Sequence, residues 1–257
     1  MKRPKLMALG YHSIWHLQNR YTLHGELYEK LSLSSVLFEE HVRFLKNTGY
    51  TFLQFRDILA MQDGTMTMPA KPILLYFDDG YRDTLLNAYP LLKKFGARAT
   101  LFVTTNFIDQ KTLPRWAGNL NPRDAGIFLT WEELRGMRDV FEIGSHAVTH
   151  RRFTTLNGGE ITEELVVSRA VIDKEIGVSP DAFSYPHSAW SEESKHAVLE
   201  AGYRIAMGVG RGYNYGSDLT FLKKVPIGHH DDVRQSSHQD GSPRCQPTTF
   251  ARRPSRC

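Results

Sequence analysis

The chain has 257 residues, of which 41% are hydrophobic and 23% are charged, and its formal net charge is +4. This composition suits one large domain of the barrel or doubly wound kind, or two small ones. The small positive charge comes without a dense Lys/Arg stripe, which argues against a nucleic-acid partner, and only two cysteines, both near the C-terminus, exclude a disulfide framework.

Short apolar runs alternate with helical patterns along most of the chain. The runs predict strands at residues 6–11, 51–55, 73–77, 99–103, 141–145, 182–186, 203–209 and 219–227. Helical spacing of apolar residues predicts helices at residues 34–49, 90–96, 131–139, 159–176 and 191–201. Strand and helix alternating in this way favour a parallel sheet with covering helices, and roughly seven or eight strands favour a closed or nearly closed barrel.

The sequence changes character after Ile227. Residues 228–257 have almost no apolar residues and no periodicity, and they contain both cysteines. Such a composition cannot bury enough apolar surface to order itself. The sequence therefore predicts a folded barrel at residues 1–227 and a disordered or non-native tail at residues 228–257.

No segment has the length of a membrane span, and the N-terminus has no apolar run long enough for a signal peptide. As written, the chain is expected to be cytoplasmic. A secreted or cell-surface location is the alternative if a leader is missing.

Polar side chains stand at the ends of several predicted strands. Asp78 and Asp79 follow residues 73–77, while His146 and His150 follow residues 141–145 in the segment GSHAVTH. The carboxyl ends of parallel barrel strands share one face, so these groups are expected to meet there. One carboxylate with two imidazoles makes a three-ligand set for a metal ion and leaves positions open for water.

Two adjacent residues on a regular strand point to opposite faces of the sheet. Asp78 and Asp79 can serve one site only if the strand end is distorted, and Gly80 would permit that distortion. One aspartate would then bind the metal while the other takes a proton from water.

The segments LYFDDGYRDTLLNAYPLLKKFGARATLFV and IGSHAVTH resemble the polysaccharide deacetylase family, carbohydrate esterase family four, with its nodulation-protein-B homology domain. The upstream YHSI and FEEHVRFLKNTGY resemble the branch that de-N-acetylates poly-N-acetylglucosamine. The resemblance covers about residues 6–227. It implies a deformed (β/α) barrel and metal-dependent hydrolysis of N-acetyl groups from an amino-sugar polysaccharide or oligosaccharide.

The resemblance also implies roles for individual residues. Asp78 would be the catalytic base that activates metal-bound water. One divalent ion, with Zn²⁺ as the first choice, would be held by Asp79, His146 and His150. Substrate and oxyanion contacts would come from His187, Tyr185 and His12.

Two family motifs depart from the pattern here. SYPH stands where the family commonly has Arg-x-Pro-Tyr, so Ser184 replaces the arginine that orients the base. The late Leu-x-His motif, which supplies the general acid, has no clean match, although His229 and His230 lie nearby. Two alternatives therefore stand beside the deacetylase: a hydrolase of a small non-sugar amide, and a non-catalytic domain that binds a metal or a glycan.

Overall fold

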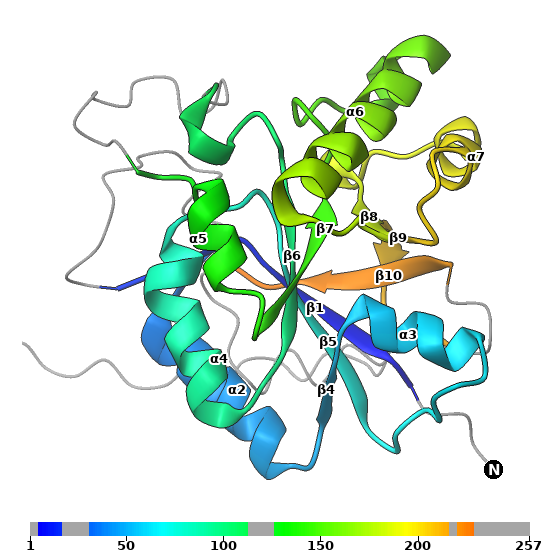
Figure 1. Cartoon of the computed structure of the whole chain (residues 1–257). Coiled ribbons are helices and arrows are strands. Elements are labelled where there is room, and N and C mark those ends of the chain that lie inside the picture. The colour runs from blue at the N-terminus through cyan, green and yellow to red at the C-terminus, as the bar shows by residue number, and fades with distance from the viewer. Residues whose placement is uncertain (1–4, 17–30, 113–125, 216–219, 229–257) are drawn as a thin grey trace, which may run out of the picture.

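A closed barrel of parallel strands forms the centre of the molecule (Figure 1). The computed structural model describes residues 5–16, 31–112, 126–215 and 220–228. Its main sheet runs in the order β1-β10-β9-β8-β7-β6-β5-β4, and pairing between β1 and β5 closes seven of the strands and leaves β4 outside. The strands are β1 (Met7–Tyr11), β4 (Thr51–Leu53), β5 (Pro72–Phe77), β6 (Ala99–Val103), β7 (Phe141–Ser145), β8 (Ala182–Ser184), β9 (Ile205–Arg211) and β10 (Phe221–Pro226).

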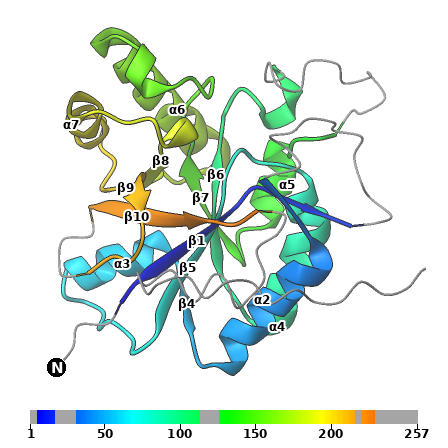
Figure 2. The ribbon, with the colours of Figure 1, turned by 180° about the vertical axis from the view of Figure 1, so that it is seen from behind.

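Helices surround this barrel on the outside, as the views from both sides show (Figures 1 and 2). They are α2 (Ser35–Asn47), α3 (Phe55–Gln62), α4 (Tyr89–Phe95), α5 (Trp131–Gly136), α6 (Gly158–Ile176) and α7 (Glu192–Glu200). The short strands β2 (Ser13–Trp15) and β3 (Ser32–Ser34) form a separate parallel pair. The predicted deformed (β/α) barrel is thus confirmed.

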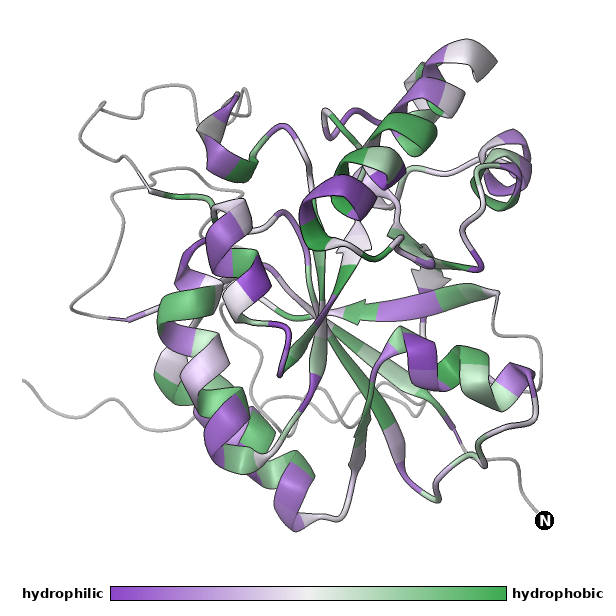
Figure 3. Cartoon of the chain, in the orientation of Figure 1, coloured by the Kyte–Doolittle hydropathy of each residue, from purple (hydrophilic) through white to green (hydrophobic). Residues whose placement is uncertain are grey.

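Most barrel strands are apolar on both faces because they are buried on both faces, and β5 is buried along its whole length. In β5, Leu75 and Phe77 pack in the cluster that also holds the apolar faces of α2 and α4. Leu74 and Tyr76 point the other way, into a second cluster with Phe102, Met207 and Leu222 that fills the barrel. The green of most strand segments in Figure 3 reflects this double burial, whereas β10, which contains two lysines, is partly purple.

Some predicted element boundaries differ from the observed ones. The predicted strand 51–55 ends at Leu53, because Gln54 caps α3 and its N–H donates to the Asp57 carboxylate at 2.8 Å. The predicted strand 182–186 ends at Ser184, and a 3₁₀ turn over Pro186–Ser188 follows, since proline has no N–H for a ladder. The sequence analysis missed α3 and the β2–β3 pair.

The predicted tail lies almost wholly beyond the described residues, whereas the expectation about membrane spans can be compared with the described helices. Of the predicted tail only Gly228 is described, so the boundary at residue 227 stays a prediction. In the described part of the chain, no helix combines the length and apolar character that a membrane crossing needs.

Candidate active site

One carboxylate and two imidazoles converge at the carboxyl end of the barrel. Asp79 follows β5, and both histidines follow β7. The Asp79 Oδ1 atom lies 3.1 Å from Nε2 of His150 and 3.5 Å from Nε2 of His146, and one ligand atom from each residue lies within 4.8 Å of the others. Ligands bound to Zn²⁺ at about 2.1 Å in tetrahedral geometry lie about 3.4 Å apart, so the three groups fit one divalent ion.

The backbone at the end of β5 is distorted, as the sequence required. Asp79 itself has φ of 75°, and Gly80 has φ of 88°. An aspartate with left-handed backbone lowers the stability of the folded state by on the order of 1 kcal/mol, and such residues cluster at functional sites. The distortion thus begins at Asp79, not only at the glycine, and it turns Asp79 toward the same site as Asp78. A Cβ on Gly80 would also lie 2.9 Å from Cδ1 of Ile108.

His146 is oriented by a bond on its far side. Its Nδ1 donates to the Ser184 carbonyl oxygen at 2.7 Å, which leaves the Nε2 lone pair directed at Asp79. Burial lowers the pKa of His146 to about 3, so its imidazole is neutral. A neutral imidazole with its second nitrogen fixed in this way is the usual form of a metal ligand.

The two adjacent aspartates have opposite electrostatic settings. Burial alone would raise the pKa of Asp79, but the imidazoles of His150, His12 and His146 outweigh it and hold that pKa below its ordinary value. Burial raises the pKa of Asp78, against the opposing charges of Lys224 and His12. Asp79 is therefore the stronger anion of the pair and the better cation ligand.

Lys224 is a site residue that the sequence analysis missed. Its Nζ lies 3.7 Å from Oδ2 of Asp78, and only 11% of its side chain is exposed. A bulge between Leu222 and Lys224 shifts the register of β10 against β9 and accompanies the inward placement of Lys224. This lysine supplies a cation beside Asp78 where Ser184 has replaced the family's arginine. A polar residue amid the apolar pattern of 219–227 was the available signal.

His12, at the end of β1, lies on another side of Asp78. Its Nε2 is 4.0 Å from Oδ2 of Asp78, and its Nδ1 is buried with no hydrogen-bond partner among the described residues. Burial lowers the pKa of His12, although the two aspartates oppose the change. The neighbouring Ser13 hydroxyl donates to Asp83, which ties the β1 end to the helix that follows the aspartate pair.

These groups form one wall of a cavity of about 410 Å³, a size within the usual range for small-ligand sites. Trp190, Arg152 and Arg211 line the rest of it together with the glycines of β9. The Trp190 ring is half-buried and carries Lys195 Nζ at 4.2 Å from its centroid. An aromatic ring and two guanidinium groups in the same cavity as the aspartates offer stacking and hydrogen bonds to a polar ligand.

The two residues of the segment SYPH that were expected to contact substrate, Tyr185 and His187, lie in different surroundings. His187 lines the cavity, and its ring centroid lies 4.5 Å from that of His150. Burial and His150 lower the pKa of His187 to about 4. Tyr185 is fully buried among Phe153 and Phe183, and its hydroxyl donates to the Ser194 carbonyl oxygen. The expectation that Tyr185 contacts substrate finds no support, because alternation along the chain turns its side chain into the core.

The fold and the site define the class of the protein: a deformed (β/α) barrel with hydrolase-type groups at the carboxyl ends of its strands. The family model of polysaccharide deacetylases matches residues 65–206, which is more than half of the chain. The chain belongs to the polysaccharide deacetylase family.

Known proteins agree with this assignment. YxkH of Bacillus subtilis, assigned to the polysaccharide deacetylases, is 29% identical over 207 residues, which cover 80% of this chain and 65% of that protein. The poly-β-1,6-N-acetyl-D-glucosamine N-deacetylase of Escherichia coli K12 is 19% identical over 81% of this chain and 35% of its own length. The chain thus spans just under two thirds of the first relative and about a third of the second.

A solved structure has the same fold. The Streptococcus pyogenes deacetylase PplD, solved in complex with acetate, superposes with a TM-score of 0.77 at 21% identity, over 92% of this chain and 98% of that one.

Proposed function

We propose that the protein is a metal-dependent hydrolase that removes acetyl groups from N-acetylated amino sugars in a polysaccharide or oligosaccharide. The observation that carries the proposal is the convergence of Asp79, His146 and His150 beside Asp78 in one cavity. The E. coli relative, whose name gives poly-β-1,6-N-acetyl-D-glucosamine as its substrate, supports the sugar class.

The donor set suits a divalent cation, with Zn²⁺ as the first choice. Two imidazole nitrogens and one carboxylate oxygen are ligands that zinc takes in catalytic sites, where a fourth position stays open. When bound, such an ion supplies Lewis acidity, which lowers the pKa of water and polarises a carbonyl oxygen.

Asp78 is the base in this proposal. Its carboxylate is buried and lies next to the cation ligand, so it can accept a proton from the attacking water at Oδ1 or Oδ2. The Lys224 ammonium at 3.7 Å favours the ionised form of Asp78 that a base needs. A carboxylate that is unprotonated at neutral pH is the form that water activation requires.

His12 is the candidate proton donor. Its Nε2 lies 4.0 Å from the base, it lines the cavity, and it is the imidazole nearest Asp78 that is outside the ligand set in the described part of the chain. After Asp78 has taken the water proton, it can pass that proton to Nε2 of His12, which can then deliver it to the departing amine nitrogen. With His12 in this role, the protein has a general acid although it lacks a clean Leu-x-His motif, and the histidines of the tail are not needed.

The test is acetate release from N-acetylglucosamine oligomers, β-1,6- and β-1,4-linked, with Zn²⁺ or Co²⁺ supplied. A small non-sugar acetamide serves as the competing substrate. Asp78→Asn should keep metal binding but lose about 10²- to 10⁴-fold in rate, as for a lost general base. Asp79→Asn should instead weaken metal binding, whereas Asp63→Asn, an exposed control at a distant turn, should change neither.

Three outcomes would overturn parts of the proposal. Faster hydrolysis of the small acetamide would point to a different substrate class. Metal loss in Asp78→Asn with retention in Asp79→Asn would reverse their roles. Metal binding without acetate release from any oligomer would favour a binding domain.

A further inference from the structure

The loop between the two histidine ligands is strained. Residues 146–150 follow β7, and within them Ala147 has φ of 67° and His150 has φ of 62°. Left-handed backbone at non-glycine residues costs on the order of 1 kcal/mol or more each and persists only where the surroundings hold it. The surroundings that hold this loop come from α6.

A buried carboxylate of α6 binds the loop between its two histidines. Glu164 is only 2% exposed. Its Oε2 accepts hydrogen bonds from the backbone N–H groups of Val148 at 2.8 Å and Thr149 at 2.9 Å. Its Oε1 accepts from the Thr149 hydroxyl and from Nε of Arg151 at 3.3 Å.

The helix places this carboxylate inside for a simple reason. Glu164 comes three residues after Ile161 and one before Leu165, and both of these side chains pack in the core. A glutamate at a core-facing position would be costly without partners. One turn further along, Ser168 bonds to Ser145, whose hydroxyl accepts from the Ala147 N–H, so α6 holds the loop at two points.

We propose that Glu164 is a positioning residue for the metal site: it fixes the loop so that His150 can join His146 and Asp79 around one ion. The proposal rests on the metal site of the proposed function. Glu164 lies outside the ligand cluster and does not line the cavity, so it acts only through the loop. Two successive amides aimed at one carboxylate oxygen form an anion-binding concavity, which is available only in the strained form of the loop.

The hydrogen bonds that Glu164 accepts from the loop, here called the clamp, depend on both of its side-chain oxygens. All four partners of Glu164 are donors, and a carboxylate has only acceptors. Glu164→Gln keeps the volume but turns an NH₂ group toward donors on one edge. One edge of the clamp is then lost while the helix and core stay the same.

The experiment measures Zn²⁺ binding by calorimetry, and the visible absorption spectrum of bound Co²⁺, on the full chain. Glu164→Gln should weaken Zn²⁺ binding by about 10- to 100-fold, the usual loss when a group that orients a ligand is removed. It should also change the Co²⁺ spectrum, which reports the ligands directly. Glu163→Gln is the matched control, since Glu163 is the exposed neighbour on the same helix, and it should change neither.

Thr149→Val is the second variant, in case Glu164→Gln folds poorly. It removes only the hydroxyl donor to Oε1 and should weaken Zn²⁺ binding in the same direction by a smaller factor. Unchanged Zn²⁺ affinity in a folded Glu164→Gln protein would overturn the positioning role, as would unchanged affinity in Thr149→Val if the first variant does not fold. A parent chain that binds no Zn²⁺ would overturn the proposed function itself, which is a distinguishable result.

Discussion

The two ends of the barrel differ in which residues adopt left-handed backbone. The turns that lead into β6, β8 and β9 take left-handed backbone at glycines, namely Gly96, Gly177 and Gly202. The segments that follow the strands take it at glycines such as Gly80 and also at other residues. All six non-glycine residues with positive φ in the described chain lie there: Asp79, Asp109, Ala147, His150, His187 and Ser188.

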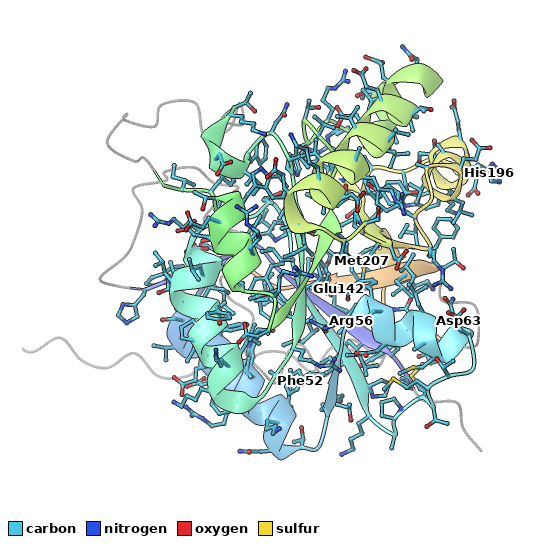
Figure 4. All side chains as sticks on the ribbon, viewed as in Figure 1. Phe52, Arg56, Asp63, Glu142, His196 and Met207 are labelled. Atoms are coloured by element: carbon cyan, nitrogen blue, oxygen red, sulfur yellow. The ribbon has the colours of Figure 1, made fainter. Side chains whose placement is uncertain are left out.

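Polar groups at the amino end of the strands are paired with one another. The fully buried Gln54 donates to the carbonyl oxygens of Ala99 at 2.9 Å and Val140 at 3.0 Å. Arg98 bonds to Asp57 at 2.8 Å. Figure 4 shows Arg56 and Glu142 together at this end, where the Arg56 N–H donates to the Glu142 carboxylate at 3.2 Å.

The carboxyl end holds more buried acidic groups than cationic side chains to pair with them. Asp78 and Asp79 are adjacent, and the basic groups near them are one lysine and three imidazoles. Asp83 is buried as well, bonded to a serine hydroxyl. The comparison indicates that polar groups at the amino end stabilise the fold, whereas those at the carboxyl end are placed for binding and catalysis. This is expected for a barrel whose loops after the strands carry the site.

The strongest way to break this comparison is to remove the metal. Under the proposed function, dialysis against a chelator should lower acetate release by about 10³-fold or more, since a bound ion of this kind lowers the barrier by several kcal/mol. The barrel should remain folded, because its core does not depend on the site. Circular dichroism of the stripped protein and recovery of activity with Zn²⁺ are the checks. Loss of the fold would show that the two ends are not independent.

A substitution at the amino end should do the reverse. Gln54→Leu removes donors from two buried carbonyl groups and should lower the free energy of unfolding by about 2–3 kcal/mol. The rate of acetate release per folded molecule should stay the same. Urea denaturation beside a kinetic assay measures both, with Gln62→Leu, exposed on the same helix, as the control. A fall in the rate of acetate release per folded molecule would show that the amino end of the barrel also affects the site.

Asp83 tests whether the carboxyl end costs stability. Burial raises its pKa to about 7 from an ordinary 3.8, so the folded state binds the proton more tightly than the unfolded state. Its favourable contribution is complete below pH 4 and is lost as the pH rises to about 7, on the order of 4 kcal/mol.

Asp83→Asn should remove that part of the pH dependence. Thermal unfolding from pH 4 to 8 for the parent and the variant gives the difference. A pH profile with the same slope in both proteins would show that Asp83 is ionised in both states.

Lys224 sharpens the comparison within the site. Lys224→Met should lower kcat by about tenfold, because the largest opposition to the burial of Asp78 is then gone and the pKa of the base rises. A base works only when deprotonated, so activity is lost as pH falls through that pKa, and the acid limb should move to higher pH. Lys223→Met, at the exposed neighbouring position, should leave the pH–rate profile unchanged.

The smallest effect concerns Tyr76, inside the barrel. Its buried hydroxyl has no hydrogen-bond partner among the described residues. Tyr76→Phe removes a group whose desolvation is not compensated, so stability should rise by less than about 1 kcal/mol and activity should not change. A clear loss of stability would show that the hydroxyl is bonded, for instance to a buried water.

Much of the fold could be predicted because burial on both faces leaves a local trace. The apolar run at 73–77 and the helical spacing at 159–176 predicted β5 and α6 to within a residue. The convergence of Asp79 with His146 and His150 could also be predicted, since each follows a strand of one parallel barrel. Tyr185 shows the limit: its place beside the site in sequence did not reveal that it faces the core.

The sequence by itself determined the alternation of strand and helix, the paired aspartates and the histidines that end their strands. Only the tertiary structure decided that Lys224 reaches Asp78, that Glu164 binds the loop between the histidines, and that Asp83 meets Ser13. The reason is physical. Periodicity along the chain records which face of an element is buried, whereas a contact between distant segments depends on register, bulges and the closure of the barrel.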